Sequence, residues 1–453
     1  MRKTKFRKIF FTILIFLILS IITTTVWAKN GPEYILVDPC EGFEALPGAQ
    51  IYCGEHNDAG YRIEVPNDWN GDLFMWAHGY RGLFSNEYLI VSNPPFRDWL
   101  IDNGYAWAAS SFSANQLNIT VGVKDTKDLV KFFQKEVAKP DRVFISGESM
   151  GGGITITSVE QWPNLYDGAM PTCGLLAPYE ALDVYWDYYV LVGALAGKDA
   201  TYPIPEDFVT SGDYAEAVNQ LAMLPDYFPF VLNDQGLQLK DAMKMQTGGI
   251  RPLYDQGFNF WYGVIDSFWG FPLVQAVIEL EPTGVHGVPM DNFDTIYQFD
   301  SDPVLSAEEI ALNELVFRIE RDPQAMHPNG LKNMPVNNGK INVPVLTLHD
   351  IGDLFVPLSQ EQIYARRVAE QGASDFLVQR VIRDFVHCAF SEEEYTTAFT
   401  DLVNWVETGV KPAEDNVLDP SVVADPNFGC QFTTEDRDYS DFAAFGLVIP
   451  PCP

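Results

Sequence analysis

The sequence is short of positive charge. It has 29 lysines and arginines against 62 aspartates and glutamates, which gives a formal net charge of −33. Beyond the first eight residues, Lys and Arg do not cluster as the binding of nucleic acid or anionic lipid requires. The composition therefore excludes a nucleic-acid partner and gives no reason to expect a stable membrane partner. It leaves the oligomeric state open.

Metal-binding patterns are also missing. None of the six cysteines belongs to a CxxC pair, and the acidic segment 291–302 lacks the spaced ligands and the glycine of a calcium loop. We therefore expect no metal site and interpret the acidic segment as a solvated surface. An even number of cysteines in an exported chain predicts disulfides. Cys40 with Cys53 is the first expected pair, because both lie in one short segment rich in turn-forming residues.

The first 28 residues have the pattern of a secretory signal peptide. Five basic residues lie within residues 2–8, an apolar stretch follows from Ile9 to Ile22, and Val26 and Ala28 place small residues at cleavage positions −3 and −1. The pattern predicts a secreted, extracellular protein. An uncleaved N-terminal membrane anchor is the alternative, because the apolar stretch can be extended through the threonines to Trp27.

Strand and helix patterns alternate in two parts of the chain. Strands are expected at 61–65, 73–77, 105–111, 142–145, 343–348 and 376–382, and helices at 121–137, 359–371 and 391–407. The last helix has a capping box at Ser391 and Glu394 and a stop at Gly409. This alternation predicts an α/β fold with a mostly parallel, doubly wound sheet, whose functional residues lie at the carboxyl ends of the strands.

The alternation stops between residues 174 and 340, where aromatic clusters replace it. We expect this segment to form a large, mainly helical lid, whose aromatic residues chiefly build the lid's own core. The predicted organisation is a signal peptide at 1–28, a core in two parts at 29–173 and 341–410, the lid at 174–340, and a C-terminal tail at 411–453 held by Cys430 and Cys452.

Ser149 is the candidate nucleophile. The strand at 142–145 runs into Gly147-Glu148-Ser149-Met150-Gly151, a GxSxG pattern that a helix follows. A serine on a sharp turn between strand and helix needs neighbours without side chains, so that its hydroxyl can project from the sheet. GxSxG alone is a weak signal, and the surrounding strand, turn and helix make it specific.

A serine hydroxyl needs a general base, and the base needs a carboxylate that fixes its tautomer. His387, just beyond the strand at 376–382, is the expected base. Asp353 is the expected carboxylate and gives the chain order Ser, Asp, His, while Asp350, nearer the strand end, is the alternative. Of the other five histidines, we interpret His78 and His349 as structural residues. We interpret the remaining three as surface residues: His56, His286 and His327.

Two backbone N–H groups are candidates for an oxyanion hole. Met150 directly follows the nucleophile, and Tyr80 lies in the string His78-Gly79-Tyr80-Arg81-Gly82 after a buried strand. Both N–H groups are expected to point at the charge that develops on a substrate carbonyl oxygen.

Taken together, these motifs resemble the α/β hydrolase superfamily, and most of all its secreted bacterial esterase and lipase-like members with an HCxF histidine loop, here His387 to Phe390. The resemblance covers roughly residues 61–173 and 343–409. It implies the α/β hydrolase fold and a Ser149, Asp353 and His387 triad with Met150 and Tyr80 as oxyanion donors. It also implies acyl transfer without fixing the substrate.

The cysteines depart from one branch of that superfamily. Tannase-like feruloyl esterases pair a cysteine just before the serine with one just after the histidine, whereas Glu148 precedes Ser149 here. Cys388, after His387, is therefore expected to pair elsewhere, with Cys430 as the suggested partner. That bond would clamp the histidine loop to the C-terminal tail.

The predicted function is hydrolysis of small-molecule or polymeric carboxylic esters through an acyl-enzyme, a reaction that needs no cofactor. A secreted serine peptidase or amidase on the same fold is the alternative, because peptidase members often show a glycine pair after the serine, as at 151–153. A non-catalytic binding protein is a third hypothesis. An apolar, aromatic lid lining would select a bulky or aromatic acyl or alcohol group.

Overall fold

The computed structural model describes residues 34–82, 87–204, 213–223, 231–265, 287–326, 334–434, 439 and 447–452. The predicted signal peptide lies outside these residues, as do His286 and His327. Within the described ranges, no helix is both long enough and apolar enough to span a bilayer.

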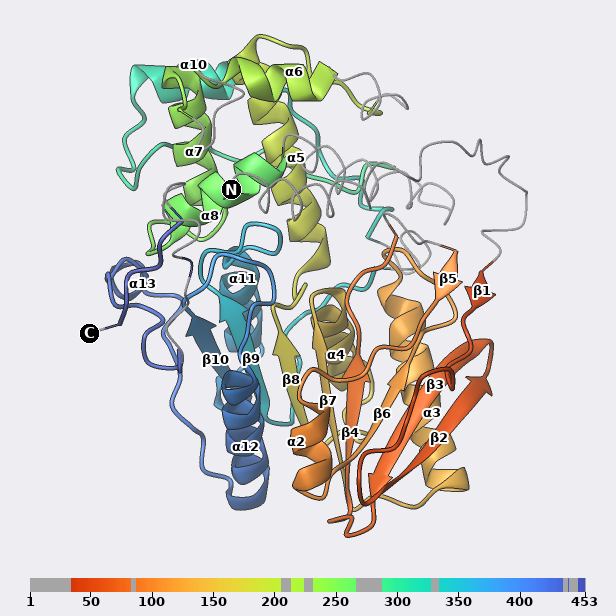
Figure 1. Cartoon of the computed structure of the whole chain (residues 1–453). Coiled ribbons are helices and arrows are strands. Elements are labelled where there is room, and N and C mark those ends of the chain that lie inside the picture. The colour runs from red at the N-terminus through yellow and green to blue at the C-terminus, as the bar shows by residue number, and fades with distance from the viewer. Residues whose placement is uncertain are drawn as a thin grey trace, which may run out of the picture.

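An eight-stranded sheet forms the base of the molecule, in the order β10-β9-β8-β7-β4-β6-β3-β2 (Figure 1). Its strands are β2 (Ala49–His56), β3 (Ala59–Pro66), β4 (Asp72–Ala77), β6 (Ala106–Ser110), β7 (Arg142–Glu148), β8 (Gly168–Thr172), β9 (Val345–Asp350) and β10 (Leu377–Ile382). β3 pairs antiparallel with β2 and β6, and the other neighbours are parallel. The predicted doubly wound α/β sheet is confirmed. Two short strands, β1 (Ile35–Leu36) and β5 (Tyr88–Leu89), pair separately.

Helices cover both faces of the sheet because successive strand residues point to opposite sides. Leu73 and Met75 pack with α3 (Ile119–Glu136), α4 (Met150–Gln161) and α11 (Ser359–Glu370). Phe74 and Trp76 pack on the other face with α2 (Arg97–Asp102) and α12 (Glu392–Thr408). Helix α12 has the predicted capping box, and Gly409 ends it with a φ of 72°.

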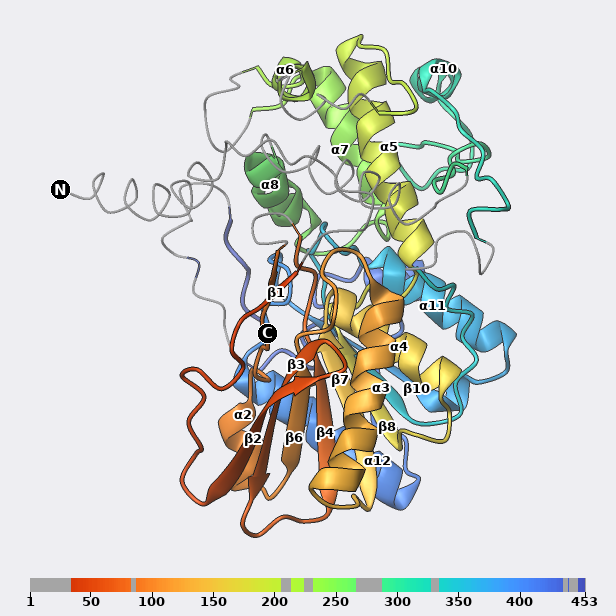
Figure 2. The same ribbon diagram turned by 90° about the vertical axis from the view of Figure 1, so that its right-hand side faces the viewer.

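A separate helical layer lies over the carboxyl ends of the strands (Figures 1 and 2). Its helices are α5 (Pro178–Ala196), α6 (Asp213–Gln220), α7 (Asp234–Gln246), α8 (Tyr254–Ile265) and α10 (Ala307–Leu315). Aromatic side chains such as Trp186, Tyr254 and Tyr297 are buried together within this layer. We call the described part of residues 174–340 the insertion.

The three disulfides correct one expectation and confirm another. Cys40 pairs with Cys53, as predicted, but Cys388 pairs with Cys173 and not with Cys430. Cys173 follows β8, and its N–H donates to the carbonyl of Leu348 on β9, so its side chain lies at the sheet edge from which the histidine loop leaves. Cys430 pairs with Cys452 and closes a loop within the tail. Two further short helices are η2 (Ser374–Phe376), before β10, and α13 (Pro420–Val423), in the tail.

Candidate active site

Ser149 occupies a sharp turn between β7 and α4. Its φ of 58° and ψ of −120° are unusual for a residue other than glycine, and such strain is often found at functional sites. The Ser149 N–H donates to the carbonyl of Thr172 at 3.0 Å, and the Ser149 carbonyl accepts the N–H of Leu175 at 3.0 Å. The turn is therefore held by the last residue of β8 and by the segment that follows this strand. The serine is only 8% exposed.

Two glycines of the GxSxG pattern are required by close approach to β4. A Cβ on Gly151 would lie 2.0 Å from the carbonyl oxygen of Ala77, and a Cβ on Gly147 would lie 2.5 Å from the same atom. Any side chain at either position would push α4 away from the sheet. The glycines thus perform the mechanical role predicted from the sequence.

His387, on the loop between β10 and α12, is paired with Asp353. Its Nδ1 lies 2.5 Å from Oδ2 of the fully buried Asp353. The second carboxylate oxygen accepts the backbone N–H groups of Phe355 at 2.8 Å and Val356 at 3.2 Å. Among the described residues, Nε2 of His387 has no hydrogen-bond partner, so the Ser149–His387 bond of a triad is not formed here. Catalytic hydrogen bonds often tighten only when substrate binds.

Asp350, the alternative carboxylate, has a different role. Its Oδ2 accepts the backbone N–H of Ala389 at 3.0 Å. Asp350 therefore holds the chain just beyond His387, whereas Asp353 holds the imidazole ring itself. The structure brings Asp353, and not Asp350, against the predicted base.

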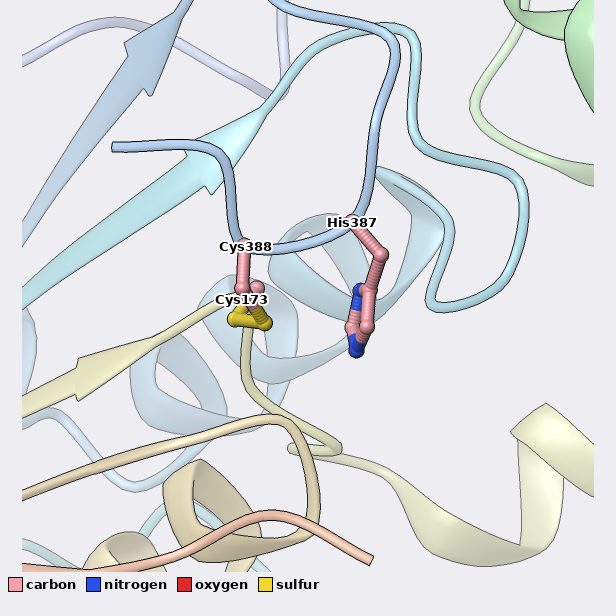
Figure 3. Close-up of side chains that lie close together, drawn as sticks. All are labelled: Cys173, His387 and Cys388. Carbon is pink, nitrogen blue, oxygen red and sulfur yellow. A yellow bond between two sulfur atoms is a disulfide. The ribbon is translucent and has the colours of Figure 1, made fainter. Parts of the chain in front are cut away.

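The Cys173–Cys388 disulfide lies beside the histidine. Figure 3 shows His387 and Cys388 on one loop, with Cys173 beneath it, and a ring nitrogen of His387 and the two sulfur atoms lie within 4.8 Å of one another. Because both sulfurs belong to the disulfide, this cluster offers no thiolate for a metal. The bond joins the histidine loop to the end of β8. The sequence did not identify Cys173 as the partner of Cys388, since only its position after a strand distinguishes it from the other cysteines.

Buried charge surrounds the nucleophile turn. Burial raises the pKa of Glu148, next to Ser149, while the nearby Arg81 guanidinium acts in the opposite direction. Burial lowers the pKa of His78 to about 3, and its ring nitrogens contact the carbonyls of Gly79 and Ser111 at 2.7 and 3.1 Å. His78 is thus neutral and structural at ordinary pH.

The two remaining described histidines make structural contacts. His349 is fully buried and its Nε2 donates to the carbonyl of Val356 at 2.9 Å, which is a structural contact. His56 is half-buried and its ring packs on Phe132 at a centroid distance of 4.7 Å.

A pocket opens next to Ser149. It encloses about 570 Å³ of empty space, part of it open to solvent, and the predicted oxyanion residues Met150 and Tyr80 both line it. The other lining residues come from the start of α5, from the segments around residues 117 and 175, and from the loop after Asp353: Leu117, Leu175, Pro178, Ala181, Leu182, Tyr185, Phe355 and Val356. Phe355 also packs edge-on against His387, at a ring-centroid distance of 5.1 Å. One side chain therefore joins the serine pocket to the base.

Three side chains of the insertion donate hydrogen bonds to the loops that carry Asp353 and His387. The Tyr185 hydroxyl donates to the carbonyl of Phe355 at 2.6 Å, and the Trp261 indole N–H donates to the carbonyl of Phe385 at 2.9 Å. The guanidinium of Arg251 donates to the carbonyl of Ile351 at 2.8 Å. These contacts were not predicted, because an aromatic cluster in the sequence does not tell which polar atoms find a partner.

Comparison with known proteins gives distant similarities. No family model matches the chain. The chain is 22% identical over 419 residues to an o-phthalyl amidase of Xanthobacter agilis, a match that covers 78% of this chain and 86% of that protein. Among solved structures, feruloyl esterase B from Aspergillus oryzae is similar with a TM-score of 0.45 and 14% identity, over 84% of this chain and 86% of that one. An acylaminoacyl peptidase of Pyrococcus horikoshii gives a TM-score of 0.36 and 11% identity, over 83% and 43%.

The order of the strands and the places of the site residues identify the fold. In chain order, Ser149 follows the fifth strand of the large sheet, Asp353 the seventh and His387 the eighth. The serine stands on a strand-to-helix elbow, and the order Ser, Asp, His is the order of α/β hydrolases. The chain has the α/β hydrolase fold.

Proposed function

We propose that this chain is a serine hydrolase that cleaves carboxylic esters through an acyl-enzyme. The 2.5 Å contact between His387 and the buried Asp353, at the same sheet edge as the Ser149 elbow, carries the proposal. One carboxylate oxygen of Asp353 accepts two backbone N–H groups, which leaves the other oxygen to accept Nδ1–H of His387 and hold that tautomer. Nε2 is then the acceptor for the serine proton.

The reaction follows from these positions. The Ser149 hydroxyl oxygen attacks the substrate carbonyl as His387 Nε2 takes its proton, and the N–H groups of Met150 and Tyr80 stabilise the oxyanion. Collapse of the tetrahedral intermediate breaks the ester bond, and the imidazolium returns the proton to the leaving alcohol. Water then attacks the acyl-serine with His387 as base, which releases the acid and restores the serine.

Amide hydrolysis is the second candidate. It is favoured by the 22% identity to an o-phthalyl amidase over 78% of the chain. The same residues serve this reaction, with an amine in place of the alcohol as the group that His387 protonates. The two candidates differ in the leaving group and share the acyl-enzyme.

One set of assays separates them. The purified protein and its Ser149→Ala variant are tested on p-nitrophenyl acetate, butyrate and palmitate, on a feruloyl ester, and on aminoacyl and phthalyl p-nitroanilides. Ester turnover that depends on Ser149, without anilide cleavage, supports the esterase. Strong anilide cleavage supports the amidase. Full turnover by Ser149→Ala, or none by the wild type, contradicts both.

We also propose that the protein is secreted. The three disulfides support this proposal, because such bonds persist in oxidising compartments. N-terminal sequencing of protein from the culture medium should find Lys29 as the first residue. Full-length protein in the membrane fraction would favour the uncleaved anchor instead.

A further inference from the structure

We propose that the pocket beside Ser149 is the acyl subsite and that it selects a bulky, uncharged acyl group. This inference rests on the proposed function and makes it specific. It uses three observations: which catalytic groups line the pocket, which residues form its walls, and which partners the nearby arginine side chains bind.

The first observation assigns the pocket to one side of the scissile bond. The leaving group must lie where His387 can protonate it, while the acyl carbonyl oxygen must lie at the oxyanion donors. Ser149 and Met150 line the pocket, whereas His387 does not belong to its described lining. Phe355 stands between the pocket and the imidazole. The pocket therefore extends from the acyl side of the reacting carbon.

The second observation is the chemistry of the walls. Apart from the nucleophile itself, the described lining consists of aliphatic and aromatic residues, with no acidic, basic or amide side chain. The hydroxyl of Tyr185 is already engaged, since it donates to the carbonyl of Phe355 at 2.6 Å. The apolar walls extend from Ser149 to Leu117, Leu182 and Tyr185, which offers more apolar surface than an acetyl group can cover. Each methylene buried there should raise kcat/KM by about fourfold.

The third observation is that the two described arginines near the site already have other partners. Arg81 neighbours Tyr80 on the chain, but its guanidinium donates to the Ile90 carbonyl and the Ser92 hydroxyl, and Glu148 faces its charge. Arg251 is buried, and its guanidinium donates to the Ile351 carbonyl at 2.8 Å.

Neither arginine lines the pocket. A carboxylate on the acyl group would lose its water with no described cation to replace it. An o-phthalyl half-ester, which carries such a carboxylate, should therefore be a poor substrate.

The test varies the acyl group at a constant leaving group. The substrates are the p-nitrophenyl esters of acetic acid, 3-phenylpropanoic acid and 3-(4-carboxyphenyl)propanoic acid. We expect kcat/KM to be at least tenfold higher for the phenylpropanoate than for the acetate, and at least 100-fold lower for the carboxylated ester than for the phenylpropanoate. Equal values for either pair would overturn the inference. Absence of Ser149-dependent turnover on all three would instead contradict the proposed function.

Two substitutions test whether the preference for a bulky acyl group arises in this pocket. Ala181→Phe should fill it and reduce the phenylpropanoate-to-acetate ratio at least tenfold, while Ala196→Phe, at the far end of the same helix α5, should leave that ratio unchanged. An unchanged ratio in folded Ala181→Phe would contradict the assignment.

Leu117 lines the pocket and is half-buried, so it can be replaced without adding a large side chain at a fully buried position. Leu117→Arg should raise kcat/KM for the carboxylated ester at least fivefold over Leu117→Gln, and salt should weaken the gain. No gain over the glutamine variant would place the acyl group elsewhere.

Discussion

The sheet-based core and the insertion hold the site in different ways. The core fixes the reacting groups through its own backbone and one covalent bond: the Ser149 turn hydrogen-bonds to Thr172, Asp353 accepts two N–H groups, and Cys173 is bonded to Cys388. The insertion contributes side-chain donors, such as Trp261, to carbonyls of the same loops. Under the proposed function, this comparison predicts that changes in the core alter the rate of the reaction, whereas changes in the insertion's share of the pocket wall alter the choice of substrate.

The strongest test of the core's part is Asp353→Asn. An asparagine cannot hold the imidazole in the Nδ1–H tautomer, so kcat on p-nitrophenyl acetate should fall by about 10⁴-fold. Asp350→Asn is the matched control, because that carboxylate accepts the N–H of Ala389 and not Nδ1 of His387. Its loss should be at least tenfold smaller. Equal losses would mean that the two aspartates share one role and would undo the assignment of Asp353.

The second test compares two disulfides of the core. The Cys173–Cys388 bond joins residues 215 apart in sequence, and the Cys40–Cys53 bond joins residues 13 apart. By chain entropy alone, replacing each pair with alanine should lower the free energy of unfolding by about 5 and about 3 kcal/mol, respectively. Only the first replacement should also reduce kcat, by about 10²-fold, because it releases the loop of His387.

Urea titrations and steady-state kinetics on the two double variants measure both effects. Unchanged kcat in folded Cys173→Ala/Cys388→Ala would show that hydrogen bonds alone position the histidine.

The third and smallest effect is a difference in pH dependence between the regions. Burial lowers the pKa of His78, in the core, to about 3 from an ordinary 6.5. As the pH falls, His78 binds a proton near pH 6.5 in the unfolded chain but only near pH 3 in the folded chain. His78 therefore lowers the stability of the fold as the pH falls from 6.5 towards 3. In the insertion, burial raises the pKa of Asp183 to about 7, although Arg321 acts in the opposite direction. Here the folded chain keeps a proton that the unfolded chain loses, so stability falls as the pH rises from about 4 to 7.

Urea unfolding between pH 4 and 8 checks these slopes. The two slopes oppose each other over most of this interval, so Asp183→Asn should make stability rise more steeply with pH between 4 and 7 than it does in the wild type. A variant with the wild-type slope over that interval would show that Arg321 keeps Asp183 ionised in the folded protein.

Sequence patterns predicted the elements that have a clear period or a clear end. Helix α12 has an apolar face, a capping box at Ser391 and a left-handed stop at Gly409, and all three were visible. Strand β2 was missed, since it is an edge strand of mixed polarity with a glycine at position 54. Helix α5 is buried along most of its length, so it shows no polar face that would mark a period.

The site was predictable to a similar degree. Ser149, His387 and Asp353 follow strands in a recognisable order, and the structure brings the last two into contact. The partner of Cys388 was not predictable, because it depends on which strand lies between β7 and β9 in the sheet. The pocket walls depend in the same way on contacts between segments more than 150 residues apart, such as the bond from Tyr185 to Phe355.

The bond between Cys173 and Cys388 also closes a covalent ring that contains the whole insertion. A protease that cuts an exposed loop of residues 174–340 would open this ring without dividing the molecule. The nicked protein would migrate as one band without reductant and as two with it, and both halves of the core would stay joined next to the histidine. A chain with this connection can be cut within the insertion and still keep the loops of Asp353 and His387 attached to β8.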